Sequence, residues 1–185
     1  IRTRTLSGLQ SEKINPIEAL MALTKLRQAA CSPELIDKHL TIPSSKIRVF
    51  LELVSELKEN KHRALVFSQF TSFLALVRQA LDKAGIEYLY LDGSVPAAQR
   101  KKLVETFQNG DMPLFLISLK AGGTGLNLTA ADYVIHLDPW WNPAVEDQAS
   151  DRAYRIGQKR PVTIYKLISE KTVEQKILEL HKTKK

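Results

Sequence analysis

The chain has 185 residues, of which 44% are hydrophobic and 25% are charged. These values are ordinary for a globular domain, and this length suffices for one domain with a sizeable core. No apolar run approaches the roughly 20 residues that a membrane span needs, so we expect no membrane partner. The sequence begins without a methionine or an apolar leader, from which we expect a fragment that lacks a signal peptide.

The formal net charge is +7, and most of it lies near the C-terminus. The stretch from Arg155 to Lys185 holds nine Lys or Arg and three Glu, which gives +6. A basic end favours nucleic acid or another polyanion as a partner, although a solvated helix would give the same count. Cys31 is the only cysteine, which excludes an intramolecular disulfide and fits a reducing, intracellular setting.

Residues 1–43 are predicted to be helical. Asn15 is a capping residue followed by a proline at the first helical position, which is a helix-start signal. The apolar stripe of this helix is formed by Ile17, Leu20, Met21 and Thr24. A Ser-Pro pair at Ser32 breaks the helix, and Pro43 marks the end of the segment. We identify no recognisable chemistry in this zone.

From Ser44 onward, helices and strands are predicted to alternate. Helices are expected at roughly 47–57, 73–83, 96–108, 143–154 and 173–180. Apolar strands are expected at roughly 64–67, 88–91, 114–117, 133–137 and 162–165. Apolar strands separated by helices indicate a parallel sheet covered on both faces, and therefore an α/β fold. In such sheets, binding sites form at the carboxyl ends of the strands.

A helical spacing of polar groups late in the chain carries the clearest chemistry. Gln148, Arg152 and Arg155 stand at i, i+4 and i+7, which places them on one face of a helix. Two buried guanidinium groups repel each other and need an anion, and their planar forks fit phosphate oxygens. The alternative is a solvated helix face on which Arg152 pairs with Glu146 or Asp151.

A glycine-rich segment, residues 118–128, follows a predicted strand. Its three glycines let the backbone approach a ligand and expose N–H groups to an anion. Ser118, Lys120 and Thr124 add donors. The spacing is not that of a Walker A loop, and the third glycine of a dinucleotide fingerprint is missing. A plain strand-to-helix turn is the alternative.

The segment after the fourth predicted strand combines an aspartate with two tryptophans. Asp138 is followed by a proline, with no glutamate to activate water, so we predict a structural or hinge role. Of Trp140 and Trp141, we predict one in the core and one exposed, where an indole can stack on bases. His136 is predicted to be a core residue. The other histidines lack metal-ligand spacing, so no metal site is expected within the chain.

Together these motifs resemble the Swi/Snf-type DNA-translocating ATPases of helicase superfamily two. The segments similar to that family's motifs are 66–70 for motif IV, 91–94 with Arg100 for motif IVa, 118–128 for motif V and 147–158 for motif VI, with 137–143 similar to the stretch between the last two. Their order and spacing agree over roughly residues 44–180. One departure is Tyr154, where many relatives have histidine.

The resemblance implies the second of two RecA-like lobes, because motifs IV to VI are present and both Walker motifs are absent. It implies a RecA-like parallel sheet with helices on both faces for residues 44–185, ending in a basic helix. Residues 1–43 would belong to an insertion or linker between the lobes. ATP with Mg²⁺ would bind mainly on the missing first lobe, so the chain alone is expected to be inactive.

The resemblance also implies site residues. Arg152 and Arg155 would act as arginine fingers on the γ-phosphate, with Gln148 orienting them or contacting the nucleotide. Gly125 and Asn127 would lie near the ribose. The residues implied in DNA binding are Gln69, Gly93, Ser94, Arg100, Ser118, Lys120 and Thr124, with Trp141 as a direct contact. Phosphate contacts carry no sequence information, so little sequence specificity is expected.

The implied partners are double-stranded DNA, the first lobe in cis and a DNA-bound protein target. Compact spacing favours a prokaryotic source, with a cytoplasmic or nucleoid location; a eukaryotic protein would be nuclear. Three alternatives stay open. They are a non-catalytic DNA-binding or scaffold domain, the second lobe of an RNA helicase, and a self-sufficient nucleotide-binding metabolic enzyme.

Overall fold

A five-stranded sheet forms the centre of the computed structural model, which describes residues 15–122, 125–156 and 158–183. The strands are β1 (Ala64–Ser68), β2 (Leu89–Leu91), β3 (Leu114–Ser118), β4 (Tyr133–His136) and β5 (Thr163–Lys166). All four pairings in the order β2-β3-β1-β4-β5 are parallel. The predicted α/β fold is therefore confirmed, and the carboxyl ends of the strands share one edge.

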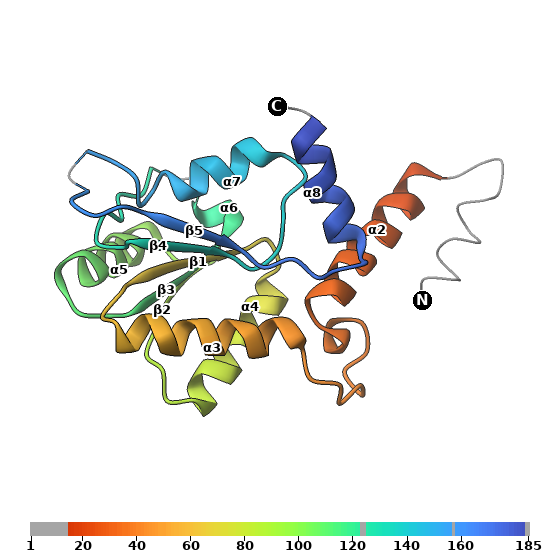
Figure 1. Cartoon of the computed structure of the whole chain (residues 1–185), viewed down its shortest axis with the longest axis horizontal. Helices are drawn as coiled ribbons and strands as arrows, with labels where there is room; N and C mark the ends of the chain where they lie inside the picture. Colours follow the sequence, from red (N-terminus) through yellow and green to blue (C-terminus); the bar gives the residue numbers. More distant parts are fainter. Residues whose placement is uncertain (1–14, 123–124, 157, 184–185) are drawn as a thin grey trace.

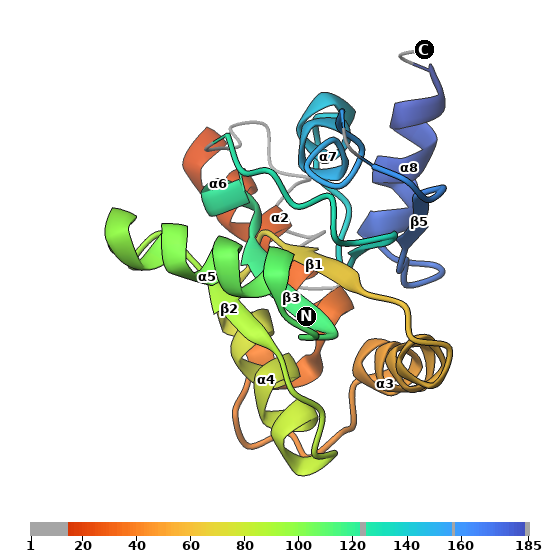
Figure 2. The ribbon, with the colours of Figure 1, turned by 90° about the vertical axis from the view of Figure 1, so that its left-hand side faces the viewer.

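Helices cover both faces of the sheet (Figure 1). They are α2 (Pro16–Cys31), η1 (Pro33–Leu35), α3 (Ser45–Glu59), α4 (Thr71–Lys83), α5 (Ala97–Asn109), α6 (Leu119–Gly122), α7 (Pro143–Ser150) and α8 (Val173–Thr183). One core cluster joins α3 and α4 to the sheet through Phe50 and Phe73. The other joins α5 and α7 to it through Phe107 and Ala149. Figure 2 shows α7 and α4 on opposite sides of the strands.

The helix α2 begins as its sequence predicts, because the side chain of Asn15 accepts a hydrogen bond from Ile17 N at 3.0 Å. Its apolar stripe nevertheless faces outward. The exposed members are Ile17, Leu20 and Met21, at 67%, 62% and 56%. The buried face carries Arg27 and Cys31 instead. α2 lies beside α8, next to the carboxyl edge of the sheet (Figure 1).

The predicted boundary at residue 43 separates segments that share a hydrogen bond. Ser44 Oγ donates to Cys31 O at 2.7 Å and accepts from Ile47 N at 3.3 Å, so one hydroxyl caps α3 and ties it to α2. The division into an inter-lobe segment and a RecA-like lobe stays a prediction. No helix in the described ranges is long and apolar enough to cross a membrane.

Two predicted elements differ from the structure. Helix α7 ends at Ser150 rather than at residue 154, where the backbone hydrogen bonds change to i−3 spacing: Arg152 N donates to Ala149 O at 3.2 Å and Ala153 N to Ser150 O at 3.0 Å, and tertiary partners hold the carbonyls that follow. Leu128 N donates to Arg152 O at 2.9 Å, and Gln158 Nε2 donates to Ala153 O at 3.0 Å. All four residues of β5 are exposed, so this edge strand is not covered on both faces as its apolar pattern predicts.

Candidate functional site

The carboxyl edge of the sheet gathers most of the side chains predicted to bind DNA. The loops after β2, β3, β1 and β4 follow one another along this edge. In that order they contribute Gly93 and Ser94, then Ser118 and Lys120, then Gln69, and finally Trp141. Lys120 is exposed, whereas Ser118 is buried at the end of β3. Thr124 lies outside the described residues.

The loop after β2 is fixed by an arginine from α5. Arg100 Nε donates to Val95 O at 2.7 Å, and its Nη2 lies 3.3 Å from Gly93 O. Ser94 donates to Asp92 Oδ1 from its backbone N at 2.9 Å and from its Oγ at 2.6 Å. The hydrogen bond from the Ser94 hydroxyl is the main cause that lowers the pKa of Asp92. Arg100 thus holds the loop in shape.

The loops after β1 and β4 are joined by a buried carboxylate. Asp138 accepts hydrogen bonds from Ser68 Oγ and from Gln69 Nε2, the latter at 2.6 Å. Burial raises the pKa of Asp138, while the Ser68 hydrogen bond and the Lys46 charge oppose that rise. These contacts fit the structural role predicted for Asp138. They also mean that Gln69, a predicted DNA contact, is held by an internal partner.

A buried ion pair also supports the loop after β4. Lys46 Nζ lies 2.7 Å from Glu174 of α8 and donates to Leu137 O at 2.6 Å. The side chains of Lys46 and Glu174 are only 5% and 1% exposed. Glu174 also accepts from Ser169 N at 2.8 Å, which satisfies more of its lone pairs. Helices α3 and α8 are therefore fastened to the carboxyl end of β4.

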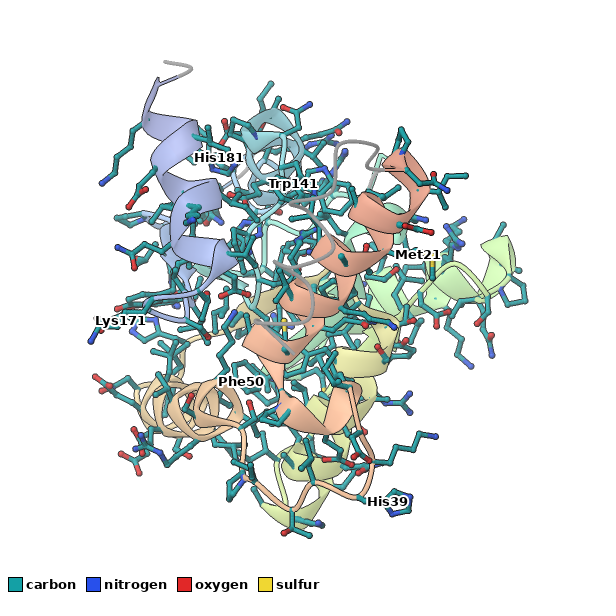
Figure 3. All side chains as sticks on the ribbon, turned by 90° about the vertical axis from the view of Figure 1, so that its right-hand side faces the viewer. Met21, His39, Phe50, Trp141, Lys171 and His181 are labelled. Carbon is teal, nitrogen blue, oxygen red and sulfur yellow. The ribbon has the colours of Figure 1, made fainter. Side chains whose placement is uncertain are left out.

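Both tryptophans of the next loop are half-buried, so the prediction of one core and one exposed indole is wrong. The guanidinium of Arg27 lies over both rings, 5.4 Å from the Trp140 centroid and 4.9 Å from the Trp141 centroid. In Figure 3, Trp141 lies between α2 and α8, near His181. No motif marks residues 1–43 as functional, so Arg27 is a site residue that the sequence does not predict. Its position one turn before Cys31, away from the apolar stripe, was the only available signal.

The predicted arginine fingers lie elsewhere, not at the carboxyl edge. Arg152 is joined through its carbonyl to Leu128, in the stretch that leads into the amino end of β4. Gln158 Nε2 donates to Thr129 O and Ala131 O at 3.0 and 2.8 Å, which fastens the segment to the same stretch. The segment of the predicted fingers is thus held beside residues 128–131 rather than with the DNA-binding set where the strands end.

Gln148, Arg152 and Arg155 do not share one helical face, because α7 ends at Ser150, between the first of them and the other two. Gln148 is exposed on α7, Arg152 is 3% exposed and Arg155 is exposed. Arg152 Nε is buried without a hydrogen-bond partner among the described atoms. Burial, and then the neighbouring charge of Arg155, lower the pKa of Arg152. Glu146 pairs with Lys166 rather than with Arg152, whereas Asp151, the other partner of that alternative, does raise the pKa of Arg152 through its charge.

Gly125 and Asn127 line a cavity of about 670 Å³ between α5 and the glycine-rich segment. Gly125 has a φ of +53°, a conformation that favours glycine. Arg100 lines the same cavity. The structure thus brings two residues predicted to lie near the ribose next to one predicted to contact DNA.

His136 is a satisfied core residue, as predicted. Its Nε2 lies 2.9 Å from Ser150 Oγ, and burial lowers its pKa to about 4. Across the described ranges, no group of three or more His, Cys, Asp or Glu side chains could hold a metal ion.

Comparisons with known proteins identify the family. Residues 45–157 match the model of the helicase conserved C-terminal domain. The chain is 46% identical over 152 residues to the Protein CHROMATIN REMODELING 19 of Arabidopsis thaliana, covering 81% of this chain and 20% of that protein. It is 39% identical over 182 residues to the human SWI/SNF-related matrix-associated actin-dependent regulator of chromatin subfamily A member 1, covering 91% of this chain and 18% of that protein.

A solved structure agrees with these relatives. The Sulfolobus solfataricus SWI2/SNF2 ATPase core in complex with dsDNA superposes with a TM-score of 0.83 and 32% identity, covering 98% of this chain and 39% of that one. The chain spans about a fifth of the length of the two curated relatives. The chain therefore belongs to the helicase conserved C-terminal domain family, as the C-terminal lobe of an ATPase of the SWI2/SNF2 type.

Proposed function

We propose that the chain is the second motor lobe of an ATP-dependent translocase on double-stranded DNA. In this proposal Arg152 and Arg155 complete an ATP site whose phosphate loop lies on a first lobe outside this chain. The carboxyl edge of the sheet holds the phosphates of one DNA strand. Closing and opening of the two lobes with each ATP would then move the protein along the duplex.

Residues 151–160, which follow α7, are called the arginine segment. Its unbalanced charge is the observation that carries the proposal. Arg152 is buried with an unpaired Nε, and the charge of Arg155 acts on it unfavourably. The charge of Asp151 offsets part of this cost but makes no salt bridge with Arg152 among the described residues, so a buried guanidinium beside a second arginine still calls for an anion. Polyphosphate suits it, because arginine forks bind phosphate oxygens in pairs and offset the charge that develops in phosphoryl transfer. Gln148 would contact or orient this nucleotide from α7.

The second part of the proposal concerns DNA. Lys120 is exposed at the edge where β3 ends, next to the loop of Ser94 that follows β2, and an exposed ammonium at this edge suits a phosphate of the DNA backbone. The solved relative that superposes over 98% of this chain is described as bound to dsDNA, which supports duplex DNA as the partner. Mg²⁺ would accompany ATP on the first lobe. The remodelling named for the Arabidopsis relative suggests a DNA-bound protein target.

The sharpest test is Arg155→Ala in the full-length protein. ATP should still bind, because its main contacts lie on the first lobe. Turnover should fall by about 10³-fold or more, as with other arginine fingers. ATP binding is measured by equilibrium titration, and hydrolysis by steady-state phosphate release with saturating duplex DNA.

Lys159→Ala is the matched control, since Lys159 is another exposed cation of the same segment. It should retain turnover within about twofold, as expected for a surface change away from the site. If Arg155→Ala turned over ATP at a near-normal rate, the finger assignment would be wrong. A protein that never hydrolyses ATP, with or without DNA, would favour the scaffold alternative.

A further inference from the structure

Arg27 has unusual surroundings for a charged side chain. It is 5% exposed, and its guanidinium lies 5.5 Å from the ring centroid of Phe70, in addition to its positions over both indoles. Nη2 donates to Pro139 O at 2.9 Å, whereas Nε is buried without a partner among the described atoms. Burial is the main cause that lowers its pKa, against the more distant charge of Asp138.

A buried guanidinium of this kind is not explained by its contribution to folding stability alone. Among the described residues it forms no salt bridge, and its charge is balanced only by ring faces and by carboxylates beyond ion-pair distance. An apolar side chain would fill the same space without the desolvation cost. The planar group offers geometry instead, because one guanidinium can stack on several rings and bind a carbonyl at once.

The contacts of Arg27 all belong to two loops of the carboxyl edge. Phe70 directly follows Gln69 in the loop after β1, and Pro139 and Trp141 belong to the loop after β4. The backbone of Trp140 has other supports, since its N donates to Glu146 at 2.6 Å and its O accepts from His181 Nε2 at 2.7 Å. The Trp141 ring, in contrast, is contacted by the guanidinium of Arg27.

From this geometry we infer that Arg27 is a positioning residue for DNA binding, and that it acts through Trp141. The guanidinium stacks on the indole from α2 and sets the angle at which the ring meets a base or sugar at the edge. Helix α2 thereby contributes to the DNA-binding surface at the carboxyl edge, although its sequence contains no recognisable motif. The inference rests on the proposed function only in taking duplex DNA as the ligand.

A double-mutant cycle in the full-length protein tests this coupling. The variants are Arg27→Leu, Trp141→Ala and both together, with Lys25→Ala as the control from an exposed position of the same helix. The measured quantities are the duplex DNA concentration for half-maximal ATPase stimulation, the turnover at saturating DNA, and the melting temperature. Arg27→Leu should raise the half-saturating DNA concentration about tenfold, the scale of one lost stacking contact. Its turnover at saturating DNA should change far less.

The double variant should need no more DNA than Trp141→Ala alone, because Arg27 acts only through that ring. Independent, multiplying effects of the two substitutions would overturn the inference, as would an unchanged half-saturating concentration in Arg27→Leu. Arg27→Lys, which keeps the charge but loses the planar stack, covers the case in which Arg27→Leu does not fold; it should show the same shift at smaller size. If the unmodified protein gave no DNA-stimulated hydrolysis, the proposed function would fail instead.

Discussion

The carboxyl edge and the arginine segment contrast in how their polar groups are satisfied. At the carboxyl edge, Gln69 is held by Asp138, and Arg100 is held by backbone carbonyls. In the arginine segment, Arg152 Nε has no partner among the described atoms, and Arg155 is exposed beside it. The polar groups of the first surface find their partners within this chain, whereas Arg152 Nε in the second does not. Under the proposed function, this is the difference between a pre-organised DNA-binding surface and half of a catalytic site.

The largest stability effect is expected at the support of the carboxyl edge. Glu174→Ala leaves the buried charge of Lys46 without its partner, so the free energy of unfolding should fall by about 3–5 kcal/mol. Glu52→Ala is the control, because it breaks the exposed Arg48–Glu52 pair of the same helix and should cost at most about 1 kcal/mol. Urea unfolding of the chain measures both. Equal losses would contradict a buried, structural role for the Lys46–Glu174 pair.

A pH effect is expected from His136, between the sheet and α7. Its pKa is lowered from 6.5 to about 4 by burial, so below pH 6.5 the unfolded chain takes up a proton that the folded chain does not. The free energy of unfolding should therefore fall by about 1.4 kcal/mol per pH unit between pH 6.5 and 4, and this contribution is fully present above pH 6.5. Comparison with His136→Gln isolates it. Parallel pH curves for the two proteins would refute the neutral, buried imidazole.

A smaller, ligand-dependent effect is expected at Lys120, which is exposed at the carboxyl edge. Lys120→Ala should leave stability within about 0.5 kcal/mol, because the side chain is exposed. In the full-length protein it should weaken DNA binding and reduce the slope of log affinity against log salt by about 1, the loss of one phosphate contact. Fluorescence anisotropy at several salt concentrations measures this. An unchanged slope would remove Lys120 from the DNA set.

The smallest stability effect is expected in the arginine segment itself. Ile156 is fully exposed at 102%, so Ile156→Ala should change the free energy of unfolding by no more than about 0.5 kcal/mol. A larger loss on urea unfolding of the chain would mean that the Ile156 side chain packs against the fold. The arginine segment would then resemble the carboxyl edge, whose groups already have partners within the chain.

The sequence predicts the sheet and its order of elements because apolar strands and caps are local signals. Asn15 before a proline specifies the start of α2, and the run of Ala64 to Phe67 specifies a central strand. The sequence overextends α7, because the change to i−3 hydrogen bonds after Ser150 and the tertiary bond from Leu128 N to Arg152 O leave no mark in the local apolar pattern. Helical spacing alone therefore could not show that Gln148 and Arg152 lie in different elements.

The sequence predicts the site residues that belong to a motif. It does not predict those that only tertiary contacts bring to the site. Glycine-rich and arginine-rich runs drew attention to Gly125, Arg152 and Arg155. Arg27 has no neighbour in sequence that explains its burial, because the rings it contacts lie more than forty residues away. The pairing of Gln69 with Asp138 likewise joins two loops that only the parallel sheet brings together.

The most direct test is ATP hydrolysis by three samples: the chain alone, the chain mixed with a separately expressed first lobe, and the full-length protein. Each is assayed with and without duplex DNA. The account predicts no turnover by the chain alone, and DNA-stimulated turnover in the full-length protein or on mixing. Hydrolysis by the chain alone would contradict it, because a complete phosphate site would then lie within these 185 residues.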